Sequence, residues 1–398
     1  MRSRDMLAYA IGLIAGGALL LASGYADRSP EVVRHNDFAG FWAGARTIVD
    51  GGSPFDAAAL TRTVDRYGTQ HPSVFGYPGW VAVAFVPFAL LPIELGSAIW
   101  TLGTMALAIV AVGALLGKWC PALPVVHTLA GLTVVSSHPA RLTVLLGQWG
   151  FLLLAAVAAA AAWLSSGHPG RAGLAATMFI AKPQLFVASA VGLAGAAIQR
   201  PGASRFFAAA VGTTIAAAIV SAIALPGWWN DWAVTVPVKL LPDPPQTTTL
   251  MTLLSNIFGG GGRFIALALI LVGAVIALGF PPNGGAWLAA WLSLSSVAAI
   301  YSWSYDHLLL IAPLVIATGV AGRRSLRAAI VGAVLWVLLL NVASTLLAVI
   351  AARRDQESYS AIVPVIAFVL AIVLVWPERS PTRLVSGKPK WARSPERV

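Results

Sequence analysis

Apolar runs long enough to cross a lipid bilayer follow one another along most of this chain. The C-terminal part shows them most densely, at residues 264–280, 288–300, 308–320, 328–350 and 361–376. A transmembrane helix needs about 20 mostly apolar residues, and its backbone groups must be hydrogen-bonded within the segment. The runs lack the alternation of a membrane β-barrel. The pattern therefore predicts an all-α polytopic membrane protein.

The small amount of charge excludes a soluble fold. Only 10% of the 398 residues are charged and 58% are hydrophobic, whereas soluble domains carry about 25% charged residues. The net charge of +11 would suggest nucleic acid as the partner of a soluble domain. Here the basic residues lie mainly in loops and tails, so they indicate membrane orientation instead, and we expect no nucleic-acid partner.

The basic residues predict which segments face the cytoplasm. Arg2 and Arg4 precede the apolar residues 7–23, which we interpret as an uncleaved first helix that starts in the cytoplasm. The tail at residues 377–398 is basic and rich in Pro and Ser, so we expect it to be disordered and cytoplasmic. Further cytoplasmic positions are Arg171, Arg200, Arg205, Arg323, Arg324 and Arg327. This orientation predicts a plasma-membrane protein with both termini in the cytoplasm.

We assign the apolar runs to successive membrane crossings so that these basic positions stay in the cytoplasm. This assignment predicts about 12 crossings in a single domain, residues 1–376. Two large loops then face outside, at residues 27–77 and 226–256. The first of these loops carries arginines of its own, such as Arg28 and Arg34, which run against the positive-inside trend.

Two regions make the threading less regular. Residues 172–180 and 185–198 are short and could form half-length helices that meet at Lys182-Pro183. Three apolar segments lie between Tyr77 and Gly147, where an even number of crossings is needed. One of them must be re-entrant or merge with a neighbour at Pro92.

With this threading, the unusual polar residues collect at the outer face of the membrane. Ionisable groups gathered at one face indicate a functional site. The residues are Asp37, Tyr77, Gln148, Lys182, Asn230, Asp231, Asp306 and His307.

Asp37 begins a short amphipathic segment in the first outside loop. Phe38, Phe41 and Trp42 start an apolar face with three- and four-residue spacing, and Gly51-Gly52 ends it. We expect a helix on the bilayer surface. Asp37 is then either a helix N-cap or a general base that takes a proton from an attacking hydroxyl group.

The cationic candidates each have two interpretations. Lys182 lies between apolar half-helices, where a lysine is costly, so it either extends to the nearer surface or binds a phosphate. His307 follows Asp306 at the start of a helix. Asp306 could simply cap that helix, with His307 as an interfacial residue, or His307 could hydrogen-bond a phosphate or a sugar hydroxyl.

Two other helix starts contribute candidates for substrate binding. Tyr77-Pro78 and Gly147-Gln148-Trp149 could each bind substrate, or each could be the ordinary start of a membrane helix at the lipid–water interface. Aromatic residues around positions 301–305 could stack on sugar faces or form the interfacial belt.

Motifs of soluble nucleotide, zinc and hydrolase sites are missing. The Asp-x-Asp pair of metal-dependent sugar-nucleotide transferases is also absent. The single cysteine, Cys120, excludes an internal disulfide and a cysteine-built metal site. We expect neither a metal nor a cofactor.

Taken in order, several short motifs resemble those of the polytopic glycosyltransferases of family 87. They are Asp37-Phe38, Gly51-Gly52-Ser53-Pro54-Phe55-Asp56, Tyr77-Pro78, Gly147-Gln148, Lys182-Pro183 and His307. Phe55 stands where the family usually has Tyr, and Gly79 replaces a second Pro. Each motif is weak alone, and their order and spacing carry the resemblance.

The resemblance implies a class C glycosyltransferase fold and an inverting transfer of a sugar, with mannose as the leading candidate. The donor would be a polyprenyl-phosphate sugar and the acceptor an envelope glycolipid or polysaccharide. Asp37 would be the general base, and Lys182 and His307 would hold the donor phosphate. Tyr77, Gln148, Asp306 and Trp42 would contact substrate. The competing interpretation is a secondary transporter or lipid flippase, a class that tends to show internal repeats; none is visible here.

Overall fold

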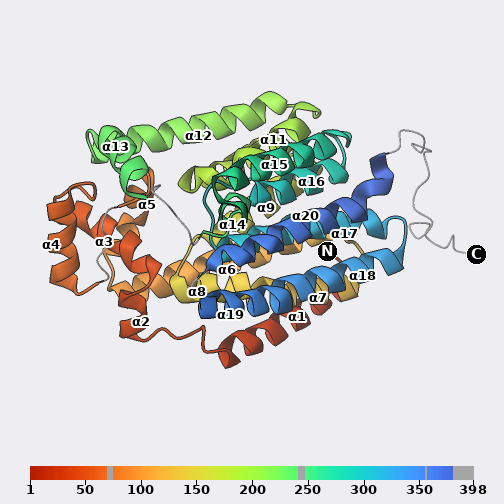
Figure 1. Ribbon diagram of the computed structural model, residues 1–398, viewed down its shortest axis with the longest axis horizontal. Helices are drawn as coiled ribbons and strands as arrows, with labels where there is room; N and C mark the ends of the chain where they lie inside the picture. Colours follow the sequence, from red (N-terminus) through yellow and green to blue (C-terminus); the bar gives the residue numbers. More distant parts are fainter. Residues whose placement is uncertain (70–74, 241–246, 355, 380–398) are drawn as a thin grey trace, which may run out of the picture.

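The computed structural model describes residues 1–69, 75–240, 247–354 and 356–379. Within these ranges the chain is built from helices and contains no strand, which confirms the predicted all-α membrane fold. Most helices run along the long axis and form one bundle, and α2 (Pro30–Arg34), α3 (Asp37–Val49), α4 (Ala57–Tyr67) and α13 (Trp228–Leu240) gather at one end of it (Figure 1). Residues 380–398 of the predicted basic tail lie outside the described residues.

Eight helical stretches of the described chain are long and apolar enough to cross a membrane. They are α1 (Ser3–Ala22), α6 (Ile93–Trp119), α7–α8 (Pro124–Leu146), α12 (Ala203–Ala224), α14–α15 (Leu250–Leu278), η4–α17 (Ser304–Gly322), α18–α19 (Leu326–Arg354) and η6–α20 (Glu357–Glu378). Four apolar helices are shorter: α5 (Gly79–Ala89), α9 (Gly150–Ser165), α11 (Val187–Ile198) and α16 (Gly285–Val297). The number of crossings stays a prediction.

The segment between Tyr77 and Gly147, where the number of crossings is ambiguous from the sequence, folds into one short helix followed by two long helical stretches. α5 has 11 residues, which at 1.5 Å per residue is about 16 Å, too short for a hydrocarbon core of roughly 30 Å. It packs against α3 at the end of the bundle, and Pro92 separates it from α6 (Figure 1). Of the three apolar segments expected here, α5 is therefore the one whose helix is too short to cross alone.

Among the long stretches of the described chain, three are interrupted or change helix type well inside their length. The elements are α7 (Pro124–Ser136) and α8 (His138–Leu146); α14 (Leu250–Phe258), η3 (Gly259–Gly261) and α15 (Gly262–Leu278); and α18 (Leu326–Val337), the π-helix η5 (Leu338–Ala343) and α19 (Ser344–Arg354). Two other stretches begin with a short 3-10 helix: η4 (Ser304–Leu310) leads into α17 (Ile311–Gly322), and η6 (Glu357–Ala361) leads into α20 (Ile362–Val375) and η7 (Trp376–Arg379).

The chain breaks its helical course at Lys182, as the sequence predicts. α10 (Pro169–Ala176) passes into η1 (Thr177–Ala181), Lys182 leaves helical geometry at φ −134° and ψ 69°, and η2 (Pro183–Leu185) leads into α11. Pro183 disfavours helical geometry at the preceding residue and lacks a backbone N–H. Such irregular backbone is tolerated in a membrane protein where it is buried in protein or lines a cavity.

The centre of the bundle is formed by α16 and α17. Every residue of α16 is buried, and so are residues 311–321 of α17. By contrast, large apolar side chains such as Ile223 on α12 and Phe264 on α15 are exposed on the outside. Apolar groups on both the inside and the outside of a helical bundle are what a lipid environment requires.

Because most helices run along the bundle, the segments that connect them lie at its two opposite ends (Figure 1). At one end, the Asp5 carboxylate accepts a hydrogen bond from Ala122 N, and the Arg323 guanidinium lies over the Trp119 ring. Arg324 donates to the Leu374 carbonyl at the same end. Two of the basic residues that the sequence assigns to the cytoplasm, Arg323 and Arg324, therefore lie at this end.

Two arginines of the first loop, Arg28 and Arg34, run against that assignment but have acceptors within the protein. Arg28 donates to Ser97 Oγ at 3.1 Å and to the Val144 carbonyl at 2.6 Å. Arg34 pairs with Glu94 at 3.3 Å. These side chains connect the loop to α6 and α8, so their positive charge has a structural explanation that is independent of membrane orientation.

Candidate active site

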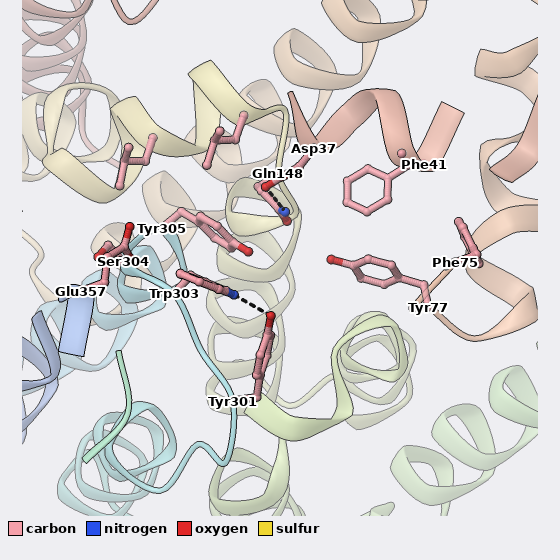
Figure 2. A pocket seen from close by; sticks show the side chains of 14 residues that line it. Asp37, Phe41, Phe75, Tyr77, Gln148, Tyr301, Trp303, Ser304, Tyr305 and Glu357 are labelled. Carbon is pink, nitrogen blue, oxygen red and sulfur yellow. Dashed lines mark hydrogen bonds between the residues drawn. The ribbon is translucent and has the colours of Figure 1, made fainter. Parts of the chain in front are cut away.

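A cavity of about 440 Å³ lies at the loop-rich end of the bundle, where segments far apart in the sequence meet (Figure 2). Its walls come from α3, the residues before α5, the corner between α8 and α9, the segment before and into η4, and η6. The lining residues are Asp37, Gly40, Phe41, Phe75, Gly76, Tyr77, Leu142, Leu146, Gln148, Tyr301, Trp303, Ser304, Tyr305 and Glu357.

Asp37 is not the cap of α3. Asn36 is, because its Oδ1 accepts a hydrogen bond from Ala39 N at 3.4 Å, while its Nδ2 donates to the Leu145 carbonyl at 2.9 Å. The Asp37 carboxylate therefore has no capping role and lines the cavity. The apolar face of α3, including the fully buried Phe38, packs against protein. This corrects the expectation of a helix that lies on the bilayer surface.

Gln148 holds the Asp37 carboxylate. Its Nε2 donates to Asp37 Oδ2 at 2.7 Å, across 111 residues of sequence. Gln148 follows Gly147, which ends α8 with φ +65°, a conformation that favours glycine. A Cβ at Gly147 would lie 2.6 Å from Phe38 Cβ, so the glycine also permits the close approach of α3 that brings the two side chains together.

Burial raises the pKa of the Asp37 carboxyl above its ordinary value, while the hydrogen bond from Gln148 and the charge of Lys182 oppose this rise. A carboxylate with a raised pKa is a better proton acceptor. Burial also raises the pKa of the Tyr77 phenol, which therefore stays protonated and can donate a hydrogen bond at neutral pH. The site thus holds a base and a donor close together.

Aromatic rings support the side of the cavity formed by α3 and Tyr77. The Tyr77 ring meets the edge of Phe41 at 4.9 Å and stacks on Trp149 at 6.4 Å, measured between ring centroids. Trp149 in turn packs against Trp100 at 5.0 Å, and Trp100 Nε1 donates to the Gly147 carbonyl. Such contacts restrict ring rotation and orient the Tyr77 hydroxyl.

The opposite wall consists of residues that the sequence identified only as an aromatic region or not at all. Figure 2 shows the hydroxyl groups of Tyr301 and Tyr305 directed into the cavity, across from that of Tyr77. Trp303 Nε1 donates to the Tyr301 hydroxyl oxygen at 2.8 Å. Glu357, which is not among the residues predicted for the site, also lines this wall and accepts from Ser304 Oγ at 3.5 Å.

Lys182 and Asp306 form a buried ion pair behind this wall. Lys182 Nζ lies 2.8 Å from Asp306 Oδ1 and 4.5 Å from the centroid of the Tyr305 ring. Their side chains are only 3% and 2% exposed. Asp306 Oδ2 also accepts from Trp303 N at 3.0 Å. The pair therefore links the break at Lys182 to the aromatic wall, and neither residue lines the cavity itself.

The remaining candidates do not line the cavity. His307 is buried, and its Nε2 has no hydrogen-bond partner in the described part of the protein. Trp42 Nε1 donates to the Leu91 carbonyl at 3.2 Å, and its ring packs against Tyr67, so it supports the loop and does not line the cavity. Asn230 and Asp231 are exposed on α13. Among the described residues, no group of three or more His, Cys, Asp or Glu side chains could hold a metal ion.

Comparisons with known proteins identify a family. A search of curated proteins found no match, and a search of solved structures found none either. A family comparison matches residues 75–299 to Glycosyltransferase family 87. This range covers more than half of the 398 residues and includes Tyr77, Gln148 and Lys182, while Asp37 and Asp306 lie outside it. The chain is therefore a member of glycosyltransferase family 87.

Proposed function

We propose that this protein is an inverting glycosyltransferase that moves a sugar from a polyprenyl-phosphate donor to a hydroxyl group of an envelope glycolipid or polysaccharide. Mannose is the first sugar to test. The observation that carries the proposal is the Asp37 carboxylate, which lines a cavity of about 440 Å³ and is held by Gln148 at 2.7 Å. Membership of the family supports a sugar transfer, and such a transfer needs a group that takes the acceptor proton.

We propose the following reaction. The acceptor hydroxyl oxygen attacks the anomeric carbon of the donor while Asp37 takes the hydroxyl proton. The bond between the anomeric carbon and the phosphate oxygen breaks, and polyprenyl phosphate leaves with the electron pair. A single displacement inverts the configuration at the anomeric carbon.

Two carboxylates line the cavity among the described residues, and the contacts favour Asp37 as the base. Asp37 is oriented by an amide donor and lies on the side of Tyr77. Glu357 is bonded to the Ser304 hydroxyl at the far edge. An oriented and partly desolvated carboxylate is the better general base.

The leaving phosphate needs hydrogen-bond donors or positive charge. No Lys or Arg is among the cavity-lining residues of the described chain, so the donors that line the cavity are neutral and include the hydroxyls of Tyr77, Tyr301 and Tyr305. We retain Lys182 and His307 as candidate phosphate ligands. For Lys182 this requires the phosphate to displace Asp306 from the ammonium group, because the two are paired at 2.8 Å.

We place the site on the outer face of the plasma membrane, with both termini in the cytoplasm. Support comes from Arg323 and Arg324, which lie between α17 and α18 at the end of the bundle away from α2, α3 and α4 (Figure 1). In a Cys120→Ser background, a membrane-impermeant maleimide should label N230C in intact cells and R327C only after permeabilisation. The reverse pattern would overturn the orientation.

The proposal is tested with Asp37→Asn, which keeps an oxygen that can accept from Gln148. Transfer from polyprenyl-phosphate mannose to an alkyl mannoside should fall by about 10²- to 10⁴-fold, as expected for loss of a general base. The melting temperature should stay close to that of the unmodified protein. The matched control, Asp231→Asn, removes an exposed carboxylate from α13 and should keep full activity.

Retained activity in Asp37→Asn would remove Asp37 from the base role. Substrate-dependent flux in proteoliposomes, without sugar transfer under any of these conditions, would instead favour a secondary transporter or lipid flippase.

A further inference from the structure

A second cavity of about 260 Å³ adjoins the first. Leu142, Ser304 and Glu357 line both cavities, and the hydrogen bond from Ser304 Oγ to Glu357 lies between them. Figure 2 shows these two residues at the edge of the first cavity, on the side away from Tyr77. We call the second space the side cavity. Its other lining residues are Tyr25, His138, Ala348, Ala351, Ala352, Gln356 and Ser360.

His138 is the unexplained residue of the side cavity. It is only 4% exposed, and neither of its ring nitrogens has a hydrogen-bond partner in the described part of the chain. The Tyr25 ring meets it edge-on, with centroids 6.5 Å apart. A buried polar group without a partner is costly, and native proteins rarely keep one without a reason. A ligand in the side cavity would supply the missing partner.

The charge of the side cavity favours a neutral ligand. Glu357 is its one charged lining residue within the described ranges. Arg141 lies nearby but is not among the lining residues; it donates to Thr345 at 2.7 Å and its guanidinium lies over the Tyr25 ring at 5.3 Å. A carboxylate repels a phosphate, so the donor phosphate does not belong in this space.

The polar groups that remain suit hydroxyl groups. A carboxylate accepts hydrogen bonds, an amide and an imidazole both donate and accept, and a serine hydroxyl does either. Gln356, Ser360 and Glu357 present these groups beside the apolar surface of Ala348 and Ala351. Ligand sites typically combine a largely apolar wall with a few polar groups that fix orientation. A sugar ring carries both kinds of surface.

We propose that the side cavity binds the neutral sugar unit next to the reacting unit of the acceptor, so that the enzyme prefers acceptors with at least two sugars. This proposal rests on the proposed function, because it assigns the acceptor to the same site. Pockets for drug-sized ligands are roughly 300–1,000 Å³, so the side cavity alone suits one small unit and the first cavity holds the reacting groups.

Kinetics with octyl glycosides of one and two mannose residues test the preference. Gln356→Ala and His138→Leu alter residues that line the side cavity alone. Each should raise the KM of the two-sugar acceptor by roughly three- to tenfold, the worth of one neutral hydrogen bond, and leave the KM of the one-sugar acceptor within about twofold. The control His168→Leu changes an exposed histidine and should alter neither. Equal changes for both acceptors, or none, would overturn the proposal.

A binding measurement separates this inference from the proposed function. Octyl dimannoside is titrated calorimetrically into the purified protein and into both variants, in a detergent without a sugar headgroup. Weaker binding in the variants supports the side cavity even if the unmodified protein transfers no sugar. Equal binding in all three, or binding of inorganic phosphate that His138→Leu weakens, would refute it. Because His138 lacks partners, His138→Leu should fold at least as stably as the unmodified protein, so a folding defect would also count against this explanation of the residue.

Discussion

The buried ion pair between Lys182 and Asp306 offers the sharpest test of how this site is built. Removing one partner of a buried pair leaves an uncompensated charge and typically costs about 3–5 kcal/mol, whereas replacing both by neutral groups is often nearly neutral. The pair is 2.8 Å long and only 3% and 2% exposed. We therefore expect Lys182→Met and Asp306→Asn each to destabilise the protein by about 3–5 kcal/mol. Asn at 306 can still accept from Trp303 N.

The double variant should be more stable than either single variant, within about 1 kcal/mol of the unmodified protein. Unfolding in mixed micelles, followed by tryptophan fluorescence, measures the four stabilities. The control Glu94→Gln breaks the Arg34–Glu94 pair, whose side chains are 42% and 33% exposed, and should cost no more than about 1 kcal/mol. Additive effects of the two single variants would show that the pair is not energetically coupled and would refute this reasoning.

The same double variant decides the role of Lys182 in phosphate binding. If Lys182 contacts the donor phosphate during the reaction, its loss removes a charge-assisted hydrogen bond of about 1.5–3 kcal/mol. The donor KM of the stable double variant should then rise by about 10- to 100-fold. An unchanged donor KM would leave Lys182 with the structural role seen here, which is to anchor the aromatic wall through Asp306.

Two further predictions concern the contact between Asp37 and Gln148. The hydrogen bond from Gln148 lowers the pKa of Asp37, so Gln148→Leu should raise that pKa. Because Asp37 must be deprotonated to act as a base, the acid limb of kcat/KM should move to higher pH, and an unmoved limb would contradict the base assignment. Gly147→Ala adds strain at φ +65° and a Cβ 2.6 Å from Phe38, so it should cost about 2–4 kcal/mol. The control Gly51→Ala meets the same kind of strain at φ +83° in open space and should cost about 1–2 kcal/mol, so equal losses would show that the contact with Phe38 is unimportant.

Local sequence patterns determined the class of fold and several parts of the site. Long apolar runs predict membrane helices because backbone groups in lipid must be satisfied within the segment. Pro183 predicts the break at Lys182 because proline disrupts the preceding helical turn. The helical spacing after Asp37 predicts α3, whose bounds are Asp37–Val49. Each of these features depends on residues that are close together in the chain.

Tertiary structure alone decided how the polar groups pair and which of them reach the cavity. Gln148 meets Asp37 across 111 residues, and Lys182 meets Asp306 across 124. No short-range pattern records such contacts, because packing of distant helices produces them. Because of the same packing, Trp42, which the sequence predicts to contact substrate, does not line the cavity, whereas Glu357 does. Of the polar residues that the sequence singles out, Asp37, Tyr77 and Gln148 line the cavity. The fold decided which partners they have, since the cost of burying a polar group depends on what lies next to it.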